Sequence, residues 1–329
     1  MEPKLSVNIG RLRLKNPVMV ASGTFGYAEE FTDFFDLKKL GAIVTKTITL
    51  KPRQGNPMPR TCETPAGMLN SIGLENPGIE VFIEEKLAAL NKIGVPLIVS
   101  IASEGGSEEF LALARRLDKI KPVQALELNI SCPNIKNSKL QTPMVRLRSP
   151  LVLSEVEGPN SKLISQDPQA TYALVKSVRR VTNKTLITKL SPNVTDITEI
   201  ALAAEHAGSD AVSLINTITG MSVDVETRKP KIATITGGLS GPAVRPLALR
   251  MVWEAYQKIK IPIIGMGGII DSSSALEFFM AGATAISVGT ANFINPRVTV
   301  EIIAGIKKYL QKNKMSSINK LIGTIRCQS

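Results

Sequence analysis

The stretch AGSDAVSLINT at residues 207–217 is echoed by AGATAISVGTA at residues 281–291. In both copies a turn of small residues leads into a short apolar run, and polar or small residues follow that run. Such an internal echo supports an architecture of repeated strand and helix units. The same pattern, an apolar run followed by a stretch of helical period, recurs along the whole chain and is typical of a parallel sheet.

Eight such apolar runs are present, and most are almost wholly apolar, as strands buried on both faces must be. Helices are expected between them at residues 107–120, 196–207 and 272–281. Most of these begin at a Ser or Asp that caps free N–H groups, and Asp167-Pro168 opens another. The expected strands are residues 18–21, 42–45, 96–101, 125–129, 186–190, 211–216, 263–265 and 285–288.

Eight units in order predict an α/β fold, a closed (β/α)8 TIM barrel whose active site is built by loops at the C-terminal ends of the strands. One domain over residues 1–329 is expected, because such barrels use about 250 residues or more as one unit. A doubly wound open sheet is the alternative, but no G-x-G-x-x-G follows the first strand. The segment LSVNIGRLRL, with a turn at Gly10, is expected to form a hairpin that closes the barrel bottom.

Composition narrows the classes of function. The chain has 329 residues, of which 43% are apolar, so it is not disordered. Its 40 basic and 28 acidic residues give a net charge of +12, which favours anionic ligands. Aromatic residues make up only 4%, which argues against single-stranded nucleic acid as a partner. No apolar run approaches the ~18 residues of a membrane span, so a protein without a membrane partner is expected.

The cysteines and the histidine further limit the chemistry. Cys62, Cys132 and Cys327 form no CxxC pair, which fits neither a metal site nor a disulfide scaffold and indicates a cytoplasmic location. Cys132 lies just past the fourth strand, where its thiol is a candidate acid or base. Cys62, in a predicted loop, and Cys327, in the tail, are given no role. The only histidine, His206, is expected at a helix C-terminus, where it interacts with the helix dipole.

Polar residues gather at the expected C-terminal ends of the strands. The glycine-rich ends of the last two strands suit a phosphate, because bare backbone N–H groups can approach its oxygens, although each glycine equally suits a tight turn. Lys46 and Lys189 end apolar strands, where a buried ammonium needs an anionic partner. Four amides on four loops suit a cyclic imide or amide ligand. The phosphate candidates are Gly241, Gly267, Gly268, Gly289 and Thr290, and the amides are Asn70, Asn129, Asn193 and Asn216.

Together these motifs resemble the class 1 dihydroorotate dehydrogenase family, and most closely its class 1B catalytic subunits. The resemblance covers nearly the whole chain. It rests on ASGTFG at residues 21–26, NSIGLENPG at 70–78, NISCPN at 129–134, KLSPNVTDI at 189–197, INTITGM at 215–221, GGLSGPAVRPLALR at 237–250, GMGGI at 265–269 and VGTANF at 288–293.

The resemblance implies a role for each matching residue. Cys132 is implied as the catalytic base. FMN contacts are implied for Ser22, Lys46, Thr47, Ser100, Asn129, Lys189, Ile215, Gly241, Gly267, Gly268, Gly289 and Thr290, with Ser100 standing where relatives often carry Asn. Substrate contacts are implied for Lys46, Asn70, Ser71, Ile72, Gly73, Leu74, Asn129, Asn193, Asn216 and Thr217.

The activity implied is oxidation of (S)-dihydroorotate to orotate in pyrimidine (UMP) biosynthesis, with hydride passing to the flavin and a proton passing to Cys132. The partners implied are a subunit that carries FAD and a [2Fe-2S] cluster and passes electrons to NAD, and a heterotetramer built on a homodimer of this chain. Three alternatives are a fumarate-linked class 1A enzyme, an FMN barrel of the dihydropyrimidine or dihydrouridine type, and a non-catalytic scaffold.

The chain departs from the family after Cys132. The connection at residues 133–166 far exceeds the dozen or so residues usual for loops. About 20 residues, 142–163, are interpreted as an insertion into the catalytic loop. We expect a surface insertion that leaves Cys132 in place, because loop tips tolerate insertion. A working lid and a lesion that impairs closure are the alternatives.

Overall fold

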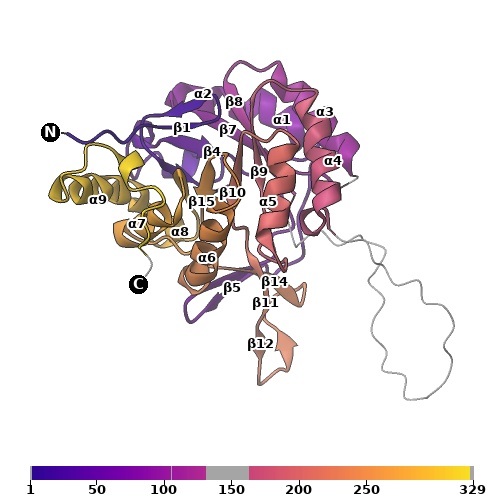
Figure 1. Cartoon of the computed structure of the whole chain (residues 1–329). Helices are drawn as coiled ribbons and strands as arrows, with labels where there is room; N and C mark the ends of the chain where they lie inside the picture. Colours follow the sequence, from indigo (N-terminus) through magenta and orange to yellow (C-terminus); the bar gives the residue numbers. More distant parts are fainter. Residues whose placement is uncertain (1, 105, 131–162, 327–329) are drawn as a thin grey trace, which may run out of the picture.

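Eight parallel strands close into a barrel in the computed structural model, which describes residues 2–104, 106–130 and 163–326 (Figure 1). The order around the ring is β10-β15-β16-β3-β4-β7-β8-β9. The predicted TIM barrel and its eight strands are therefore confirmed. The barrel strands are β3 (Val18–Val20), β4 (Ala42–Val44), β7 (Leu97–Ile101), β8 (Val123–Asn129), β9 (Thr185–Lys189), β10 (Ala211–Leu214), β15 (Ile263–Gly265) and β16 (Ala285–Val288).

Helices surround this barrel and bury its outer face (Figure 1). Every residue of β4, β7 and β9 is buried, which explains their continuous apolar composition. The helices are α1 (Gly78–Val81), α2 (Leu87–Ile93), α3 (Ser107–Asp118), α4 (Pro168–Arg179), α5 (Ile197–His206), α6 (Arg245–Tyr256), α7 (Ser272–Ala281), α8 (Ala291–Ile294) and α9 (Val298–Lys312). The π-helix η3 (Phe82–Lys86) joins α1 to α2, and the 3-10 turns are η1 (Glu29–Phe31), η2 (Leu37–Lys39), η4 (Ile164–Gln166), η5 (Pro242–Val244) and η6 (Ile318–Lys320).

Aspartates cap three of these helices. The side chain of Asp167 accepts hydrogen bonds from two N–H groups of α4, Asp196 accepts one in α5, and Asp271 accepts one in α7. The predicted serine cap of α3 is wrong, because Ser107 is already helical and Gly106, which has no side chain, occupies the cap position. None of the helices in the described ranges is both long and apolar enough to cross a membrane.

A second, antiparallel sheet lies on the connections that follow β4 and β10, and the sequence did not predict it (Figure 1). Its order is β11-β14-β6-β5. Cys62 belongs to β5, so the predicted loop at this cysteine is wrong. The strands are β5 (Thr61–Thr64), β6 (Gly67–Asn70), β11 (Ile218–Met221) and β14 (Thr236–Ser240), and the pair β12 (Val223–Asp224) and β13 (Lys229–Pro230) extends beyond it.

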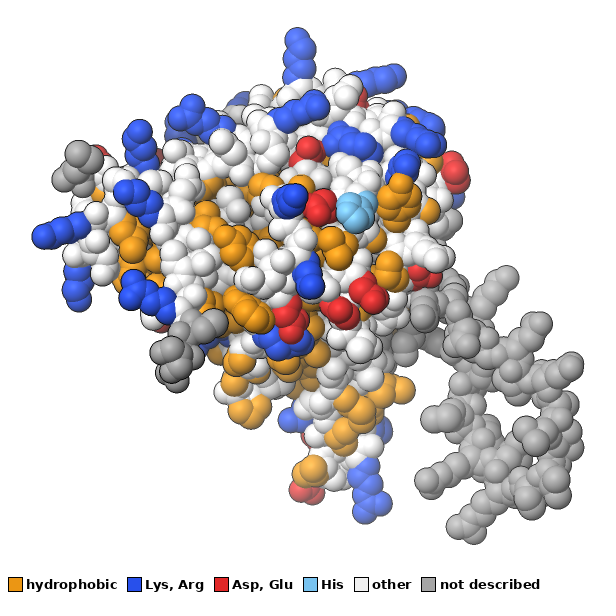
Figure 2. All heavy atoms as spheres, viewed as in Figure 1, with side chains coloured by type: hydrophobic (Ala, Val, Ile, Leu, Met, Phe, Trp, Pro, Cys, Tyr) orange, Lys and Arg blue, Asp and Glu red, His pale blue; other side chains and the backbone are white. Residues whose placement is uncertain are grey.

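The surface is basic without a single basic stripe on the face shown in Figure 2, where Lys and Arg side chains are spread over the barrel. Hydrophobic side chains gather on the projection that carries β11 and β12 (Figure 2). Met221, Val223 and Val225 are exposed there.

The N-terminal hairpin closes the end of the barrel at which the strands begin, as predicted. β1 (Val7–Ile9) pairs with β2 (Leu12–Leu14), and Gly10 makes the turn with φ +56°. A Cβ atom on Gly10 would lie 2.5 Å from Cβ of Asp210, the residue just before β10. The close approach of the turn to the strand starts therefore requires glycine at this position.

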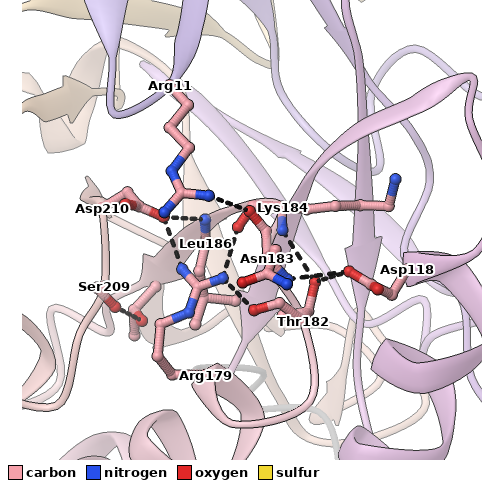
Figure 3. Close-up of polar contacts among 10 residues, drawn as sticks. Arg11, Asp118, Arg179, Thr182, Asn183, Lys184, Leu186, Ser209 and Asp210 are labelled. Atoms are coloured by element: carbon pink, nitrogen blue, oxygen red, sulfur yellow. Dashed lines mark hydrogen bonds and ion pairs between the residues drawn. The ribbon is translucent and has the colours of Figure 1, made fainter.

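A polar network beneath the hairpin joins the ends of α3 and α4 to the starts of β9 and β10 (Figure 3). Arg179 forms an ion pair with Asp210 at 2.8 Å, and Asp210 also accepts a hydrogen bond from the N–H of Leu186 at 2.8 Å. Asp118 accepts hydrogen bonds from the Thr182 hydroxyl at 2.6 Å and from the N–H of Asn183. This network holds the starts of β9 and β10 in place next to the ends of α3 and α4.

Replacing Asp210 with Asn tests this network. The variant removes the negative charge that is paired with the half-buried Arg179, so we expect a loss of about 1–3 kcal/mol in the free energy of unfolding, measured by urea titration. Glu254→Gln is the matched control, because Glu254 pairs with Arg250 on an exposed helix face and should cost less than about 0.5 kcal/mol. Equal losses in the two variants would contradict a structural role for the network.

Asp118 predicts a pH dependence of stability. The hydroxyl of Thr182 is the main cause that holds the pKa of Asp118 below its ordinary value. A lowered folded-state pKa stabilises the fold above the unfolded pKa, about 3.9, and that stabilisation is lost as pH falls through the folded pKa. We therefore expect Asp118→Asn to be less stable than the parent at pH 7, with a gap that narrows below about pH 4. A gap that is constant from pH 7 to pH 3 would refute this.

Candidate active site

The side chain of Lys189 extends across the inside of the barrel at its mouth, the end at which the eight strands finish. It is the last residue of β9 and is 4% exposed, and its Nζ donates a hydrogen bond to Oγ of Ser22 at 3.1 Å. Ser22 follows β3, which lies opposite β9 in the ring. The ammonium therefore spans the interior and presents a buried positive charge to whatever occupies the mouth.

Lys46 supplies a second cation at the same end. It lies two residues past β4, is half-buried, and donates its backbone N–H to the carbonyl of Gly26 at 3.0 Å. Within the described ranges, its ammonium makes no hydrogen bond or ion pair with another residue. A half-buried and unpartnered cation favours an anionic ligand.

A chain of polar side chains runs along the mouth from β7 to the end of β10. The hydroxyls of Thr47 and Ser100 lie 3.0 Å apart, and Nδ2 of Asn129 donates to Oγ1 of Thr47 at 3.2 Å. Nδ2 of Asn216 in turn donates to Oδ1 of Asn129 at 3.4 Å. The Thr217 N–H donates to Oδ1 of Asn216 at 2.8 Å. These contacts fix the orientation of the two amides, which is what positioning a polar ring requires.

Asn193 extends this chain on the loop after β9. Its Nδ2 donates to the Thr217 carbonyl at 3.2 Å, and its Oδ1 accepts the N–H of Thr219 at 2.9 Å. Asn70 joins from the antiparallel sheet, where its Nδ2 donates to the carbonyl of Gly238 at 3.2 Å. A Cβ on Gly238 would lie 2.0 Å from Oγ1 of Thr217, so Asn70 and Thr217 flank the same glycine. All four predicted amides are thus at this end of the barrel, although Asn70 ends a strand and Asn129 is the last residue of β8.

The glycines predicted for phosphate also come together. A Cβ on Gly268 would lie 3.0 Å from the carbonyl oxygen of Gly241, and Oγ1 of Thr290 donates to Oγ of Ser240 at 2.7 Å. Gly267 packs against Ile215, whose Cγ1 would be 3.4 Å from a Cβ at that glycine. These ends of β14, β15 and β16 form one wall of backbone, which suits a phosphate group.

The carbonyls of residues 71–74 are all occupied by hydrogen bonds from nearby residues. Asn56 donates from Nδ2 to the Ser71 carbonyl at 3.0 Å and from its N–H to the Ile72 carbonyl at 3.0 Å. Nε of Arg53 donates to the Gly73 carbonyl at 3.1 Å. The N–H groups of Ile72, Gly73 and Leu74 make no hydrogen bond to any residue in the described part of the chain. A segment with its acceptors satisfied and its donors free is suited to an anion.

The backbone of this segment is left-handed at Gly73, with φ +75°, and at Leu74, with φ +59°. A leucine seldom adopts this conformation, so the surrounding contacts must impose it. The Ser71 hydroxyl is fully buried and has no partner in the described ranges. Unsatisfied groups and strain in one segment are typical of a ligand site.

Several predicted residues lie elsewhere or outside the described ranges. Cys132, the proposed insertion up to residue 162, and Cys327 are among the residues that the structure does not describe. His206 ends α5, as predicted. Arg53, Asn56 and Ser240 also support the site, but they match no recognised motif and were not predicted. The Pro- and Gly-rich stretch around Asn56 is the only local signal in the sequence.

Comparison with known proteins agrees with this geometry. The family model described as dihydroorotate dehydrogenase matches residues 4–310. Proteins called dihydroorotate dehydrogenase B (NAD(+)), catalytic subunit, from Trichlorobacter lovleyi and Geotalea daltonii are 49% and 50% identical over 325 residues, which cover 99% of this chain and 99% of each relative. The protein of the same name from Caldicellulosiruptor bescii is 48% identical over 321 residues, which cover 98% of this chain and 99% of that relative. With the closed barrel and the polar mouth, these matches show that the chain belongs to the dihydroorotate dehydrogenase family.

Proposed function

We propose that this chain is the FMN-containing catalytic subunit of an NAD-linked dihydroorotate dehydrogenase, which oxidises (S)-dihydroorotate to orotate in pyrimidine biosynthesis. One observation carries the proposal: a buried cation, a chain of oriented amides and a glycine wall meet at one barrel mouth. The name shared by relatives at 48–50% identity supports the NAD-linked class. A fumarate-linked enzyme would use the same pocket and is the alternative.

The residues of the mouth fit FMN, which when bound supplies the hydride acceptor. A Cβ on Gly289 would meet only Ala21 and Thr24, at 3.7 and 3.9 Å, so open space lies beside the glycine wall. We assign the phosphate to Gly241, Gly267, Gly268, Gly289 and Thr290, and the rest of the cofactor to Ser22, Lys46, Thr47, Ser100, Asn129, Lys189 and Ile215. The Lys189 ammonium would stabilise negative charge on the reduced ring.

The substrate is an anionic cyclic imide, and two features suit its two parts. The free N–H groups of residues 72–74 and the Lys46 ammonium offer donors to a carboxylate. The linked amides of Asn70, Asn129, Asn193 and Asn216 both donate and accept, as the edge of a pyrimidine ring requires. Ser71, Gly73 and Thr217 complete the proposed substrate contacts. Oriented amides hold the ring in line for transfer.

We propose Cys132 as the base that removes the proton from C5 of dihydroorotate. It follows the oriented Asn129 by only three residues in the chain. His206, the only histidine, lies at the end of an outer helix and is not a competing base. The proposal includes one domain over residues 1–329, with a surface insertion at residues 142–163 that leaves this cysteine in place.

The partners are also part of the proposal. "Catalytic subunit" in the relatives' name supports a second subunit. We propose that it carries FAD and a [2Fe-2S] cluster, and that the assembly is a heterotetramer on a homodimer of this chain. Fumarate reduction by the isolated chain, without the second subunit, would favour the alternative class.

Anaerobic titration tests the substrate. The purified chain should be yellow, and dihydroorotate should bleach it. Dihydrouracil, which lacks the carboxylate, should leave the flavin oxidised, because the donors of residues 72–74 then have no anion to bind. Bleaching by dihydrouracil alone would reassign the chain to an enzyme of the dihydropyrimidine type.

Cys132→Ser tests the base. We expect flavin reduction by dihydroorotate to slow by about 10²–10⁴-fold in stopped-flow absorbance, because a serine hydroxyl is a far weaker base. FMN content should be unchanged. Cys62→Ser is the matched control, because Cys62 lies in β5, where its thiol donates a hydrogen bond to the neighbouring Glu63 carbonyl. A Cys132→Ser variant that reduces at the parent rate would exclude Cys132 as the base.

Gly289→Ala tests the phosphate wall. The methyl group meets no protein atom closer than 3.7 Å, so the apoprotein should keep its melting temperature. If the phosphate lies there, the methyl group takes its space, and we expect FMN affinity to fall at least about tenfold, or ~1.4 kcal/mol, by fluorescence titration. Unchanged affinity would move the phosphate elsewhere.

A further inference from the structure

Only two charged side chains are buried within the ranges that the structure describes, and they lie on adjacent barrel strands. Glu127 of β8 is 2% exposed, and Lys189 of β9 is 4% exposed. The mechanism proposed above uses Lys189 and leaves Glu127 without a role. A buried carboxylate in an apolar strand is costly unless something compensates its charge.

Both side chains face the interior of the barrel. Lys189 must do so, because its Nζ reaches Ser22 beyond the opposite strand. Its Cα is paired with Asn129 on one side and with Ser213 on the other, so these side chains share its face. Glu127 precedes Asn129 by two residues and therefore points the same way. It lies one layer below the floor of the mouth.

The hydrogen bonding of Glu127 leaves its charge poorly compensated. Its Oε2 accepts a hydrogen bond from Oγ of Ser213 at 3.0 Å, across β9. Its Oε1 has no partner among the described residues. One neutral hydroxyl does not balance a buried carboxylate. Lys189, the only other buried charged side chain of the described ranges, belongs to β9, the strand between Glu127 and Ser213, and carries the opposite charge.

We propose that Glu127 is the counter-charge of Lys189 and that it lowers the reduction potential of the flavin bound above it. The proposal rests on the proposed function, since it concerns the same cofactor. An uncompensated Lys189 would stabilise the anionic reduced ring and raise its potential. Glu127 lies one layer further from the mouth and offsets part of this rise in potential, because charges inside the barrel are only weakly screened. The flavin can then pass its electrons on after each reduction.

In this proposal Glu127 does not contact the substrate or the cofactor. It acts on the flavin indirectly, by balancing the charge of Lys189. A merely structural role would change stability but not the potential of the flavin. The two tests below separate these roles.

The first test measures thermal unfolding of the apoprotein in four forms: parent, Glu127→Gln, Lys189→Gln and the double variant. Lys189→Gln leaves the Glu127 carboxylate buried without an opposite charge. The double variant should therefore have a higher melting temperature than Lys189→Gln alone. If the double variant is no more stable than Lys189→Gln, the proposal that Glu127 balances the charge of Lys189 is overturned. If Lys189→Gln does not fold, a folded double variant supports the pair and an unfolded one overturns it. This test needs no flavin, so it stands even if the proposed function fails.

The second test measures the potential of bound FMN by equilibration with a reference dye. Glu127→Gln should favour the reduced form by about tenfold in the two-electron equilibrium constant, a rise of ~30 mV. A shift below about threefold, or a fall in potential, overturns the proposal.

Two controls accompany this measurement. Ser213→Ala keeps the carboxylate and loses only the hydroxyl, so its shift should be smaller than that of Glu127→Gln. Glu254→Gln removes one negative charge from an exposed helix face, where solvent screens it, and should leave the potential unchanged. A rise of equal size in Glu254→Gln would assign the effect to net charge and overturn the role of Glu127.

Discussion

The closure of the barrel is the constraint on which the site depends. The eighth strand pairs with the first, Ile286 with Val18, and the N–H of Ala21 donates to the carbonyl of Val288 at 2.8 Å. Closure brings all eight C-terminal strand ends to one rim and lets Lys189 reach Ser22, 167 residues earlier in the chain. An open sheet would leave those two residues far apart, so the buried ammonium would lose the partner that orients it.

The barrel was predictable because burial on both faces leaves a strong local signal. A strand such as β9, with all five residues buried, shows its position through composition alone. The aspartate caps at Asp167 and Asp196 were also readable, because an N-cap is a local interaction. For the site, the strand-end rule located Lys46, Lys189 and the amides, since the end of a strand in sequence is also its end in space.

The antiparallel sheet over the mouth was not predictable, for the opposite reason. β5 and β11 are only partly buried, and β14 contains adjacent glycines, so none shows the apolar run of a core strand. The contact of Asn70 with Gly238 joins residues 168 positions apart, and no local pattern specifies such a partner. The hydrogen bond from Asn56 to the Ser71 carbonyl spans only 15 positions, but it too depends on how two loops pack.

The two lysines of the mouth show how burial divides chemically identical groups into different tasks. Lys46 is half-buried and lacks a protein partner in the described ranges, so its charge is available to a ligand that comes and goes. Lys189 is buried permanently, and a permanent charge in a barrel interior calls for a permanent balance. The only other buried charged side chain of the described ranges, Glu127, lies on the neighbouring strand β8, and we propose that it supplies this balance. The mouth therefore holds two kinds of cation, one open to a ligand and one enclosed by the fold.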